Sequence, residues 1–434
     1  MDGESLFIQE NGFIKQMEKL AIIGTGVAGM GCGHFLHKKY DITLFEENDY
    51  VGGHTNTVSV DEDGTPVYMD TGFMVFNYET YPNLCKLFEE IKAPVKKSDM
   101  SFSVQYVPDQ LEYCGSGLNG LFVQKKNLIN IRFIKMLMQI ARFNKESVKI
   151  LDDPRYENHS LGQYAKEFGY SDDMLWKYLV PMSSAVWSTP MEQMLDFPVV
   201  TLIRFFQNHG FLGLNTQHQW YTLHNGSESY KKLLIEPFKD KIQVNNGVRK
   251  VSLAGNKAIV HTANGNLYEF DKVIFACHAN QALQILEQPG DDEKRLLSPF
   301  HYQKNTATVH CDESIMPKNK KAWSSWNYRI EERNGVKMPT TIYWMNSLQQ
   351  VSKKKNYFVS INALPGSVRK DKTFQVIDYE HPLFDVVAIN TQKELWKLNE
   401  AGPLYYCGSY FKYGFHEDAY ASAVSLCRKI LNNE

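Results

Sequence analysis

Three glycines and one acid have the spacing of a turn that binds phosphate and ribose. Gly24, Gly26 and Gly29 form a G-x-G-x-x-G pattern directly after the apolar run Leu20 to Ile23. In such a turn the first glycine permits the bend, the second lets a pyrophosphate approach the backbone, and the third lets the helix pack on the strand. Glu46 ends the next apolar run about 20 residues later, where a ribose-binding acid belongs. The pattern therefore predicts a dinucleotide site.

The ribose-binding acid has one competitor, because Glu47 stands beside Glu46. We assign the role to Glu46, which directly follows the apolar strand "DITLF". The alternative is a glycine-rich turn with an acid placed by chance. The order of strand, glycine turn, helix, strand and acid favours the nucleotide site.

A second glycine pair, Gly52-Gly53, distinguishes flavin from nicotinamide. The strand–helix–strand unit can hold the ADP half of either cofactor. A second close backbone approach soon after the acid suits the extended middle of FAD. We therefore expect FAD, with His54 beside the flavin or the phosphates.

Several longer motifs resemble those of the flavin-containing amine oxidase superfamily. They include "GGHTNTV", "DTGFMVFN", "VPMSSAVWSTP", "ACHANQAL" and "YGFHEDAY". The resemblance is closest to the predicted NAD/FAD-binding flavoproteins associated with cyclopropane-fatty-acid-synthase-like methyltransferases, and it implies lipid acyl-chain chemistry. Two positions depart from the superfamily: His54 replaces a common Arg, and Ser409 follows Gly408 where many flavoproteins have an acid.

The resemblance implies an α/β fold. It has a discontinuous Rossmann-like FAD-binding domain with an interleaved α+β substrate domain, as in amine oxidases. After an N-terminal extension (1–16), we expect FAD-binding segments at 17–115, 231–295 and 396–434. The substrate domain is expected at 116–230, mostly helical, and at 296–395. The strand-rich stretch from Ile242 to Cys277 predicts a β-meander with turns at Ala254-Gly255 and Asn264-Gly265.

The resemblance also assigns further cofactor contacts. Gly72 would lie close to the flavin, Val248 would hold the adenine through its backbone, and Gly408 would form the turn after the last strand. A helix beginning near Glu417-Asp418 would direct its N–H groups towards the flavin O2 side, with Asp418 at the cofactor. The alternative for these two acids is simple helix capping.

Flavin chemistry needs a substrate C–H over N5 in a dry pocket, so aromatic residues are candidate pocket walls. Their alternative role is ordinary core. His416 is the candidate acid or base, and Lys304 lies where amine oxidases often carry a lysine that holds water near N5. The candidate walls are Trp187, Trp323, Trp326, Tyr328, Tyr343 and Trp344.

Composition excludes several classes of protein. The net charge of −2 gives no sign of nucleic-acid binding. The seven cysteines form no C-x-x-C pair, so we expect reduced thiols in a cytoplasmic protein and no metal site. The acid-free basic stretch 125–145 has apolar residues at helical spacing. It predicts either a helix with its stripe in the core or a peripheral contact at the inner membrane face.

These observations predict an FAD-dependent oxidoreductase that acts on a fatty-acyl or other lipid substrate by hydride transfer to flavin N5. Three alternatives stay open: a flavin amine oxidase, a lipid double-bond isomerase, and a non-catalytic flavin-binding partner of a lipid methyltransferase.

Overall fold

A five-stranded parallel sheet carries the glycine turn at its centre. The computed structural model describes residues 6–8, 14–213 and 216–432. The sheet order is β11-β4-β3-β15-β21 and all of its pairs are parallel. Its strands are short apolar runs because both faces are covered. The strands are β3 (Lys19–Ile23), β4 (Asp41–Phe45), β11 (Ile242–Gln243), β15 (Lys272–Phe275) and β21 (Leu404–Tyr406).

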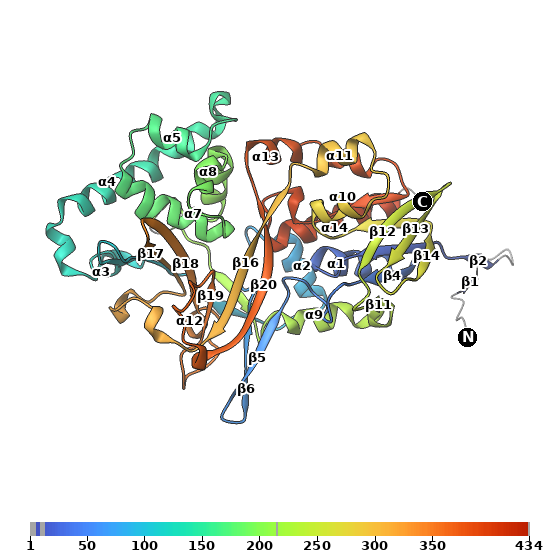
Figure 1. Cartoon of the computed structure of the whole chain (residues 1–434), viewed down its shortest axis with the longest axis horizontal. Coiled ribbons are helices and arrows are strands. Elements are labelled where there is room, and N and C mark those ends of the chain that lie inside the picture. Colours follow the sequence, from blue (N-terminus) through green and yellow to red (C-terminus); the bar gives the residue numbers. More distant parts are fainter. Residues whose placement is uncertain (1–5, 9–13, 214–215, 433–434) are drawn as a thin grey trace.

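Two helices from opposite ends of the chain pack together against this sheet. They are α1 (Val27–Leu36) and α14 (His416–Asn432). A Cβ added to Gly31 of α1 would lie 3.0 Å from the ring of Tyr420 in α14, so the small residue lets the helices approach closely. The helices α2 (Pro82–Glu90) and α9 (Glu228–Ile235) complete this half of the molecule (Figure 1).

A second, seven-stranded sheet forms the other half, in the order β20-β16-β19-β18-β17-β8-β9. Its neighbours are antiparallel except for β17 and β8. Its strands are β8 (Phe102–Tyr106), β9 (Leu111–Cys114), β16 (His301–His310), β17 (Trp326–Arg333), β18 (Val336–Trp344), β19 (Phe358–Ile361) and β20 (Thr373–Leu383).

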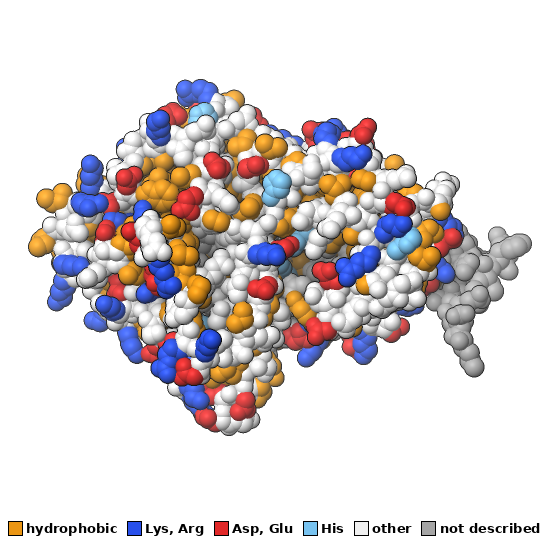
Figure 2. Space-filling model, viewed as in Figure 1, with side chains coloured by type: hydrophobic (Ala, Val, Ile, Leu, Met, Phe, Trp, Pro, Cys, Tyr) orange, Lys and Arg blue, Asp and Glu red, His pale blue; other side chains and the backbone are white. Residues whose placement is uncertain are grey.

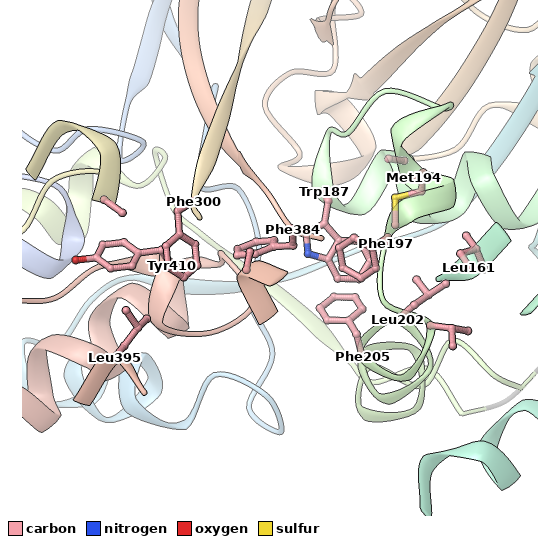
Figure 3. Close-up of a cluster of buried hydrophobic side chains, with 14 of the residues drawn as sticks. Leu161, Trp187, Met194, Phe197, Leu202, Phe205, Phe300, Phe384, Leu395 and Tyr410 are labelled. Carbon is pink, nitrogen blue, oxygen red and sulfur yellow. The ribbon is translucent and has the colours of Figure 1, made fainter. Parts of the chain in front are cut away.

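Helices cover one end of this sheet (Figure 1). A cluster of buried side chains, including Trp187, Phe197 and Phe205, holds them together, and Phe384, Phe300 and Tyr410 extend it towards the parallel-sheet half (Figure 3). The helices are α3 (Gly117–Leu121), α4 (Ile131–Glu146), α5 (Leu161–Glu167), α6 (Asp172–Met174), α7 (Val180–Trp187) and α8 (Val199–Asn208).

Smaller sheets and helices complete the fold. The predicted meander is present as β12 (Val248–Ala254), β13 (Lys257–Thr262) and β14 (Leu267–Phe270). Two further pairs are the hairpin β5 (Thr57–Glu62) with β6 (Thr65–Asp70), and β7 (Val95–Ser98) with β10 (Trp220–Leu223). The remaining elements are β1 (Leu6–Ile8), β2 (Ile14–Gln16), α10 (Ala279–Ile285), α11 (Asp291–Leu297), α12 (Met345–Leu348) and α13 (Val386–Gln392).

The chain crosses between the two halves several times, in keeping with the predicted interleaved α/β architecture. One detail differs from the expected segment 17–115. Strands β8 and β9 fall inside it, yet they pair in the seven-stranded sheet, because β8 lies parallel to β17. The domain boundaries otherwise stay predictions, and most of 1–16 lies outside the described residues.

Candidate active site

The glycine turn has the geometry that its three roles require. The Gly24 N–H donates to the Phe45 carbonyl at 2.9 Å, and its φ of +100° is one that residues with a side chain rarely adopt. A Cβ on Gly29 would lie 1.9 Å from the Gly24 carbonyl oxygen, so this position packs helix on strand. A Cβ on Gly26 would meet nothing within 4 Å. Gly26 therefore faces open space, and it lines the large cavity described below.

Thr25 connects the acid to the second glycine pair. Glu46 Oε2 accepts the Thr25 hydroxyl at 2.5 Å and the Thr25 N–H at 3.2 Å. Glu46 Oε1 accepts the N–H and side-chain amide of Asn48 at 3.0 and 2.9 Å. The Thr25 hydroxyl also accepts the Gly52 N–H at 3.2 Å. Glu46 is buried whereas Glu47 is exposed, so the local geometry favours Glu46 as the fixed acid.

A cavity of about 900 Å³ joins this turn to the seven-stranded sheet. Its volume lies at the upper end of the range for ligand pockets. Predicted cofactor residues in its lining are Gly24, Gly26, Glu46, Gly53, His54, Gly72, Val248 and Gly408. Gly29 and Gly52 lie behind the lining: a Cβ on Gly52 would lie 2.6 Å from the Thr55 carbonyl oxygen and 2.9 Å from Lys231.

The two glycine segments lie against each other. A Cβ on Gly53 would be 3.3 Å from the Gly26 Cα. A Cβ on Gly72 would be 2.3 Å from the His54 carbonyl oxygen, so this strand end packs under the Gly-Gly turn. The arrangement leaves bare backbone along one side of the cavity, which is what an extended dinucleotide needs.

Three lining residues carry a buried polar atom with no hydrogen-bond partner among the described residues. Buried polar groups are normally paired, so these atoms point to a ligand with polar groups of its own. They are His54 Nε2, Trp326 Nε1 and Tyr410 Oη. Together with the bare glycines, they fit a flavin dinucleotide.

His54 is a neutral side chain where related flavoproteins commonly carry Arg. Its ring stacks on Tyr379 at 4.7 Å and lies 5.1 Å from His381. Burial first, and then the neighbouring histidines, hold its pKa well below the usual value. Burial also lowers the pKa of His381 to about 4, and its Nδ1 lies 2.8 Å from the side-chain nitrogen of Asn305. This side of the cavity is therefore polar but uncharged.

His416 is held tightly at the N-terminus of α14. Its Nε2 lies 2.6 Å from the Tyr230 hydroxyl and 3.4 Å from that of Thr55, and its ring stacks on Phe73 at 3.9 Å. Burial lowers the pKa of His416 to about 3. The imidazole is thus neutral, and the contacts of its Nε2 with the Tyr230 and Thr55 hydroxyls hold the ring in place, so the geometry favours a positioning role. The predicted catalytic role remains a prediction.

The two acids that follow His416 do not face the cavity. Glu417 accepts the N–H groups of Asn83 and Leu84 at 3.0 Å each, so it caps α2 and not its own helix. Asp418 accepts the Phe415 N–H at 3.0 Å, and burial raises its pKa to about 7. The structure does not bring the Asp418 side chain into the lining, contrary to the expected cofactor contact.

Three of the predicted pocket walls line the cavity: Trp187, Trp326 and Tyr343. The Trp187 N–H donates to the Tyr413 carbonyl at 3.1 Å, and the rings of Trp326 and Tyr343 stack at 6.0 Å. Six further apolar residues line the cavity and were not predicted, because a motif does not show which of its side chains face a cavity. They are Met100, Phe205, Phe211, Trp220, Leu348 and Phe415.

Three other predicted walls lie elsewhere. Tyr328 is buried in the core and its hydroxyl donates to Ser184 at 2.7 Å. Trp344 points to the opposite face of β18 from Tyr343, because neighbouring strand residues alternate. It packs against Trp323 at 5.4 Å, and its N–H donates to Asn356 at 2.9 Å. Trp323, Tyr328 and Trp344 are therefore not among the residues that line this cavity.

Lys304 lines the exposed edge of the cavity. It lies on β16 directly opposite Glu380 of β20. Its predicted role in holding water remains a prediction. Among the described residues, no group of three or more His, Cys, Asp or Glu side chains could hold a metal ion, and all seven cysteines are free thiols.

Comparison with known proteins gives a family. The model of the family described as "Flavin containing amine oxidoreductase" matches residues 27–348. A 1-hydroxycarotenoid 3,4-desaturase from Flavobacterium sp. (strain P99-3) is 23% identical over 292 residues, which are 59% of this chain and 56% of the desaturase. The chain thus matches little more than half the length of this relative.

Two solved structures share the fold at low identity. Putrescine oxidase bound to putrescine is 14% identical with a TM-score of 0.67, and covers 96% of this chain and 99% of its own. A CLA-producing fatty acid isomerase from P. acnes is 13% identical with a TM-score of 0.67, and covers 95% of this chain and 98% of its own. The chain therefore belongs to the flavin-containing amine oxidoreductase family.

Proposed function

We propose that the enzyme oxidises a hydrophobic substrate with a fatty-acyl or similar lipid chain. One observation carries the proposal. Of the described residues that line the cavity, Glu46 is the one charged residue that is buried, and it lies at the nucleotide end beside Thr25. The other buried lining side chains are aromatic, aliphatic or uncharged, so a neutral chain can enter this region without leaving a charge unpaired.

Bound FAD supplies an acceptor for a hydride from a substrate carbon, which leaves the substrate oxidised by two electrons. The protein contributes orientation and dryness. Trp187 is fixed by its bond to the Tyr413 carbonyl and by packing on Phe197 and Phe205 at 4.5 and 4.7 Å (Figure 3). A rigid aromatic wall of this kind excludes water and aligns an apolar chain.

The names of two relatives support a lipid substrate. One is a carotenoid desaturase and the other a fatty acid isomerase. Because one of them is an isomerase, a redox-neutral shift of a double bond stays among the alternatives. The same acyl substrate could bind in this pocket for oxidation or for isomerisation. A non-catalytic partner of a lipid methyltransferase would bind lipid without turnover.

A specific observation keeps amine oxidation as the second candidate. Asp378 and Glu380 line the exposed edge of the cavity and could pair with an ammonium group outside the apolar part. Such a substrate would place its charge at that edge and its carbon chain inside.

An anaerobic screen separates these candidates. Fatty acids, acyl lipids and alkyl amines of matched chain length are mixed with the holoenzyme, and the flavin absorbance band and product mass are recorded. We expect bleaching by acyl chains, with a product lighter by two hydrogens. Bleaching by amines alone would favour the second candidate, an unchanged mass with a moved double bond would favour isomerisation, and no bleaching by any ligand would contradict an oxidase of either kind.

A further inference from the structure

Exposed apolar side chains lie on α3, on α4 and on the turn between them. These elements are at the opposite end of the molecule from α1 and the five-stranded sheet (Figure 1). The turn between α3 and α4 is Lys125–Ile129. Ile129 is 87% exposed and Ile131 is 83% exposed, so these side chains project fully into solvent. The apolar members are Leu118, Leu128, Ile129, Ile131 and Met138; we call them, with the lysines below, the 118–145 surface.

The core does not explain these side chains. Helix α4 has a separate buried face made by Phe133, Met136 and Phe143, which pack in the main core cluster. The apolar residues at helical spacing in the stretch 125–145 are Leu128, Ile131, Ile134, Leu137, Met138 and Ala141. Of these, Leu128, Ile131 and Met138 are exposed. The interpretation of the whole stripe as core is therefore wrong. An exposed contiguous apolar surface commonly marks a contact with a partner or a membrane.

The same surface is basic. No Asp or Glu occurs between positions 115 and 145. Lys125, Lys126, Lys135 and Lys145 are exposed and form no ion pair within the described part of the chain. The two arginines are already paired: Arg132 binds Asp173 at 2.9 Å and Arg142 binds Glu146 at 3.2 Å. Four unneutralised ammonium groups thus lie among the exposed aliphatic side chains.

We propose that the 118–145 surface docks on an anionic lipid bilayer. Its exposed Ile and Leu side chains would enter the boundary between headgroups and acyl chains, while its lysines would contact lipid phosphates. Figure 2 shows hydrophobic and Lys or Arg side chains side by side at this left-hand end. The contact is peripheral: among the described residues, no helix has the length and apolar character to cross a membrane. An acidic protein surface could pair with the lysines. It would leave the exposed isoleucine and leucine side chains without an apolar partner, whereas a bilayer supplies acyl chains for them.

This inference stands apart from the proposed substrate, because it rests on surface residues and not on the cavity. It is tested by sedimentation of the holoenzyme with vesicles of phosphatidylcholine alone or mixed with phosphatidylglycerol. We expect recovery only with the anionic vesicles, and a decline as salt is raised because the ion contacts are screened. The flavin spectrum reports whether each variant is folded and loaded.

Two double variants examine the two parts of the surface. Ile129→Gln with Ile131→Gln removes apolar side chains, and Lys125→Gln with Lys126→Gln removes charges. Each double variant should lower vesicle affinity by roughly tenfold or more, because burial of an apolar side chain and placement of a lysine near an anionic surface each contribute about 1 kcal/mol or more. Matched controls lie at the opposite end (Figure 1): Leu253→Gln with Leu267→Gln on the exposed meander, and Lys38→Gln with Lys39→Gln after α1. Both controls should bind like the wild type.

Equal recovery of all variants, or no preference of the wild type for anionic vesicles, would overturn the proposal. Loss of binding in the lysine variant alone would also overturn it, because the apolar groups would then not enter the bilayer. No recovery of the wild type with any vesicle would overturn the proposal as well.

Discussion

The Thr25 hydroxyl donates to Glu46 Oε2 at 2.5 Å, so a residue within the glycine turn fixes the acid at the end of the next strand. The same hydroxyl accepts the Gly52 N–H, which joins all three predicted cofactor features in one network. The orientation of Glu46 is therefore set before FAD binds, with Asn48 holding the other oxygen. Preorganisation of this kind lowers the cost of binding.

Replacement of Glu46 by Ala should weaken FAD retention by well over tenfold. A carboxylate that accepts ribose hydroxyls makes charge-assisted bonds of roughly 1.5–3 kcal/mol each. Glu47→Ala is the matched control and should retain FAD, because this side chain is exposed. Equilibrium dialysis of the apoprotein with FAD measures both. A greater loss in the Glu47 variant would move the ribose contact to that residue.

Gly26→Ala and Gly29→Ala should fail in different ways. The new Cβ at position 26 meets no protein atom, so the apoprotein should fold normally but should lose at least roughly tenfold in FAD affinity as the methyl group meets the phosphates. At position 29 the Cβ would overlap the Gly24 carbonyl oxygen, so the fold itself should be destabilised. Thermal unfolding of the apoproteins distinguishes the two. Equal melting temperatures would contradict this division of roles.

Asp418 should make the protein less stable as pH rises. Burial raises its pKa to about 7, above the usual value near 3.8. Between these two values the folded state binds a proton that the unfolded state has released, so stability is fully present below about pH 4 and is lost on approach to pH 7. Asp418→Asn keeps an acceptor for the Phe415 N–H but cannot ionise. Its melting temperature at pH 8 should exceed that of the wild type.

The comparison is made by melting both proteins from pH 5 to 8. The wild-type curve should fall with pH more steeply than that of the Asn variant. Parallel curves would show that Asp418 is not the group responsible, and a wild type that gains stability with pH would contradict a raised pKa.

Local features of the cofactor site could be predicted from the sequence, because neighbouring residues determine them. The strand, the turn and the helix fix the positions of Gly24, Gly26 and Gly29, and the end of the next strand fixes Glu46. The dinucleotide site followed from these short-range patterns, and the Gly52-Gly53 pair indicated that the dinucleotide is FAD.

Contacts between residues that are far apart in the sequence could not be predicted. Tyr230 reaches His416 only because α9 and α14 meet in the fold, and Glu417 caps α2 from the other end of the chain. His381 reaches His54 through the position of β20 at the edge of the large sheet. No short motif contains such information.

Two neighbouring residues of β18 also show why the pocket walls could not be predicted from the sequence. Tyr343 lines the cavity and Trp344 does not, although they are neighbours, because only the sheet decides which face of β18 meets the cavity. The pairing of β8 with β17 likewise needs two segments far apart in sequence, so the sheet membership of 102–114 was not evident.

The central claim is that the apolar part of the cavity binds an acyl chain beside the flavin. The most direct measurement is anaerobic flavin reduction by a homologous series of straight-chain acyl substrates, with the apparent dissociation constant taken from the dependence of the rate on concentration. Each buried CH₂ contributes about 0.8 kcal/mol, so affinity should rise roughly three- to fourfold per added carbon until the cavity is full, and then stop rising. Affinity that is independent of chain length, or reduction limited to short amines, would contradict the account.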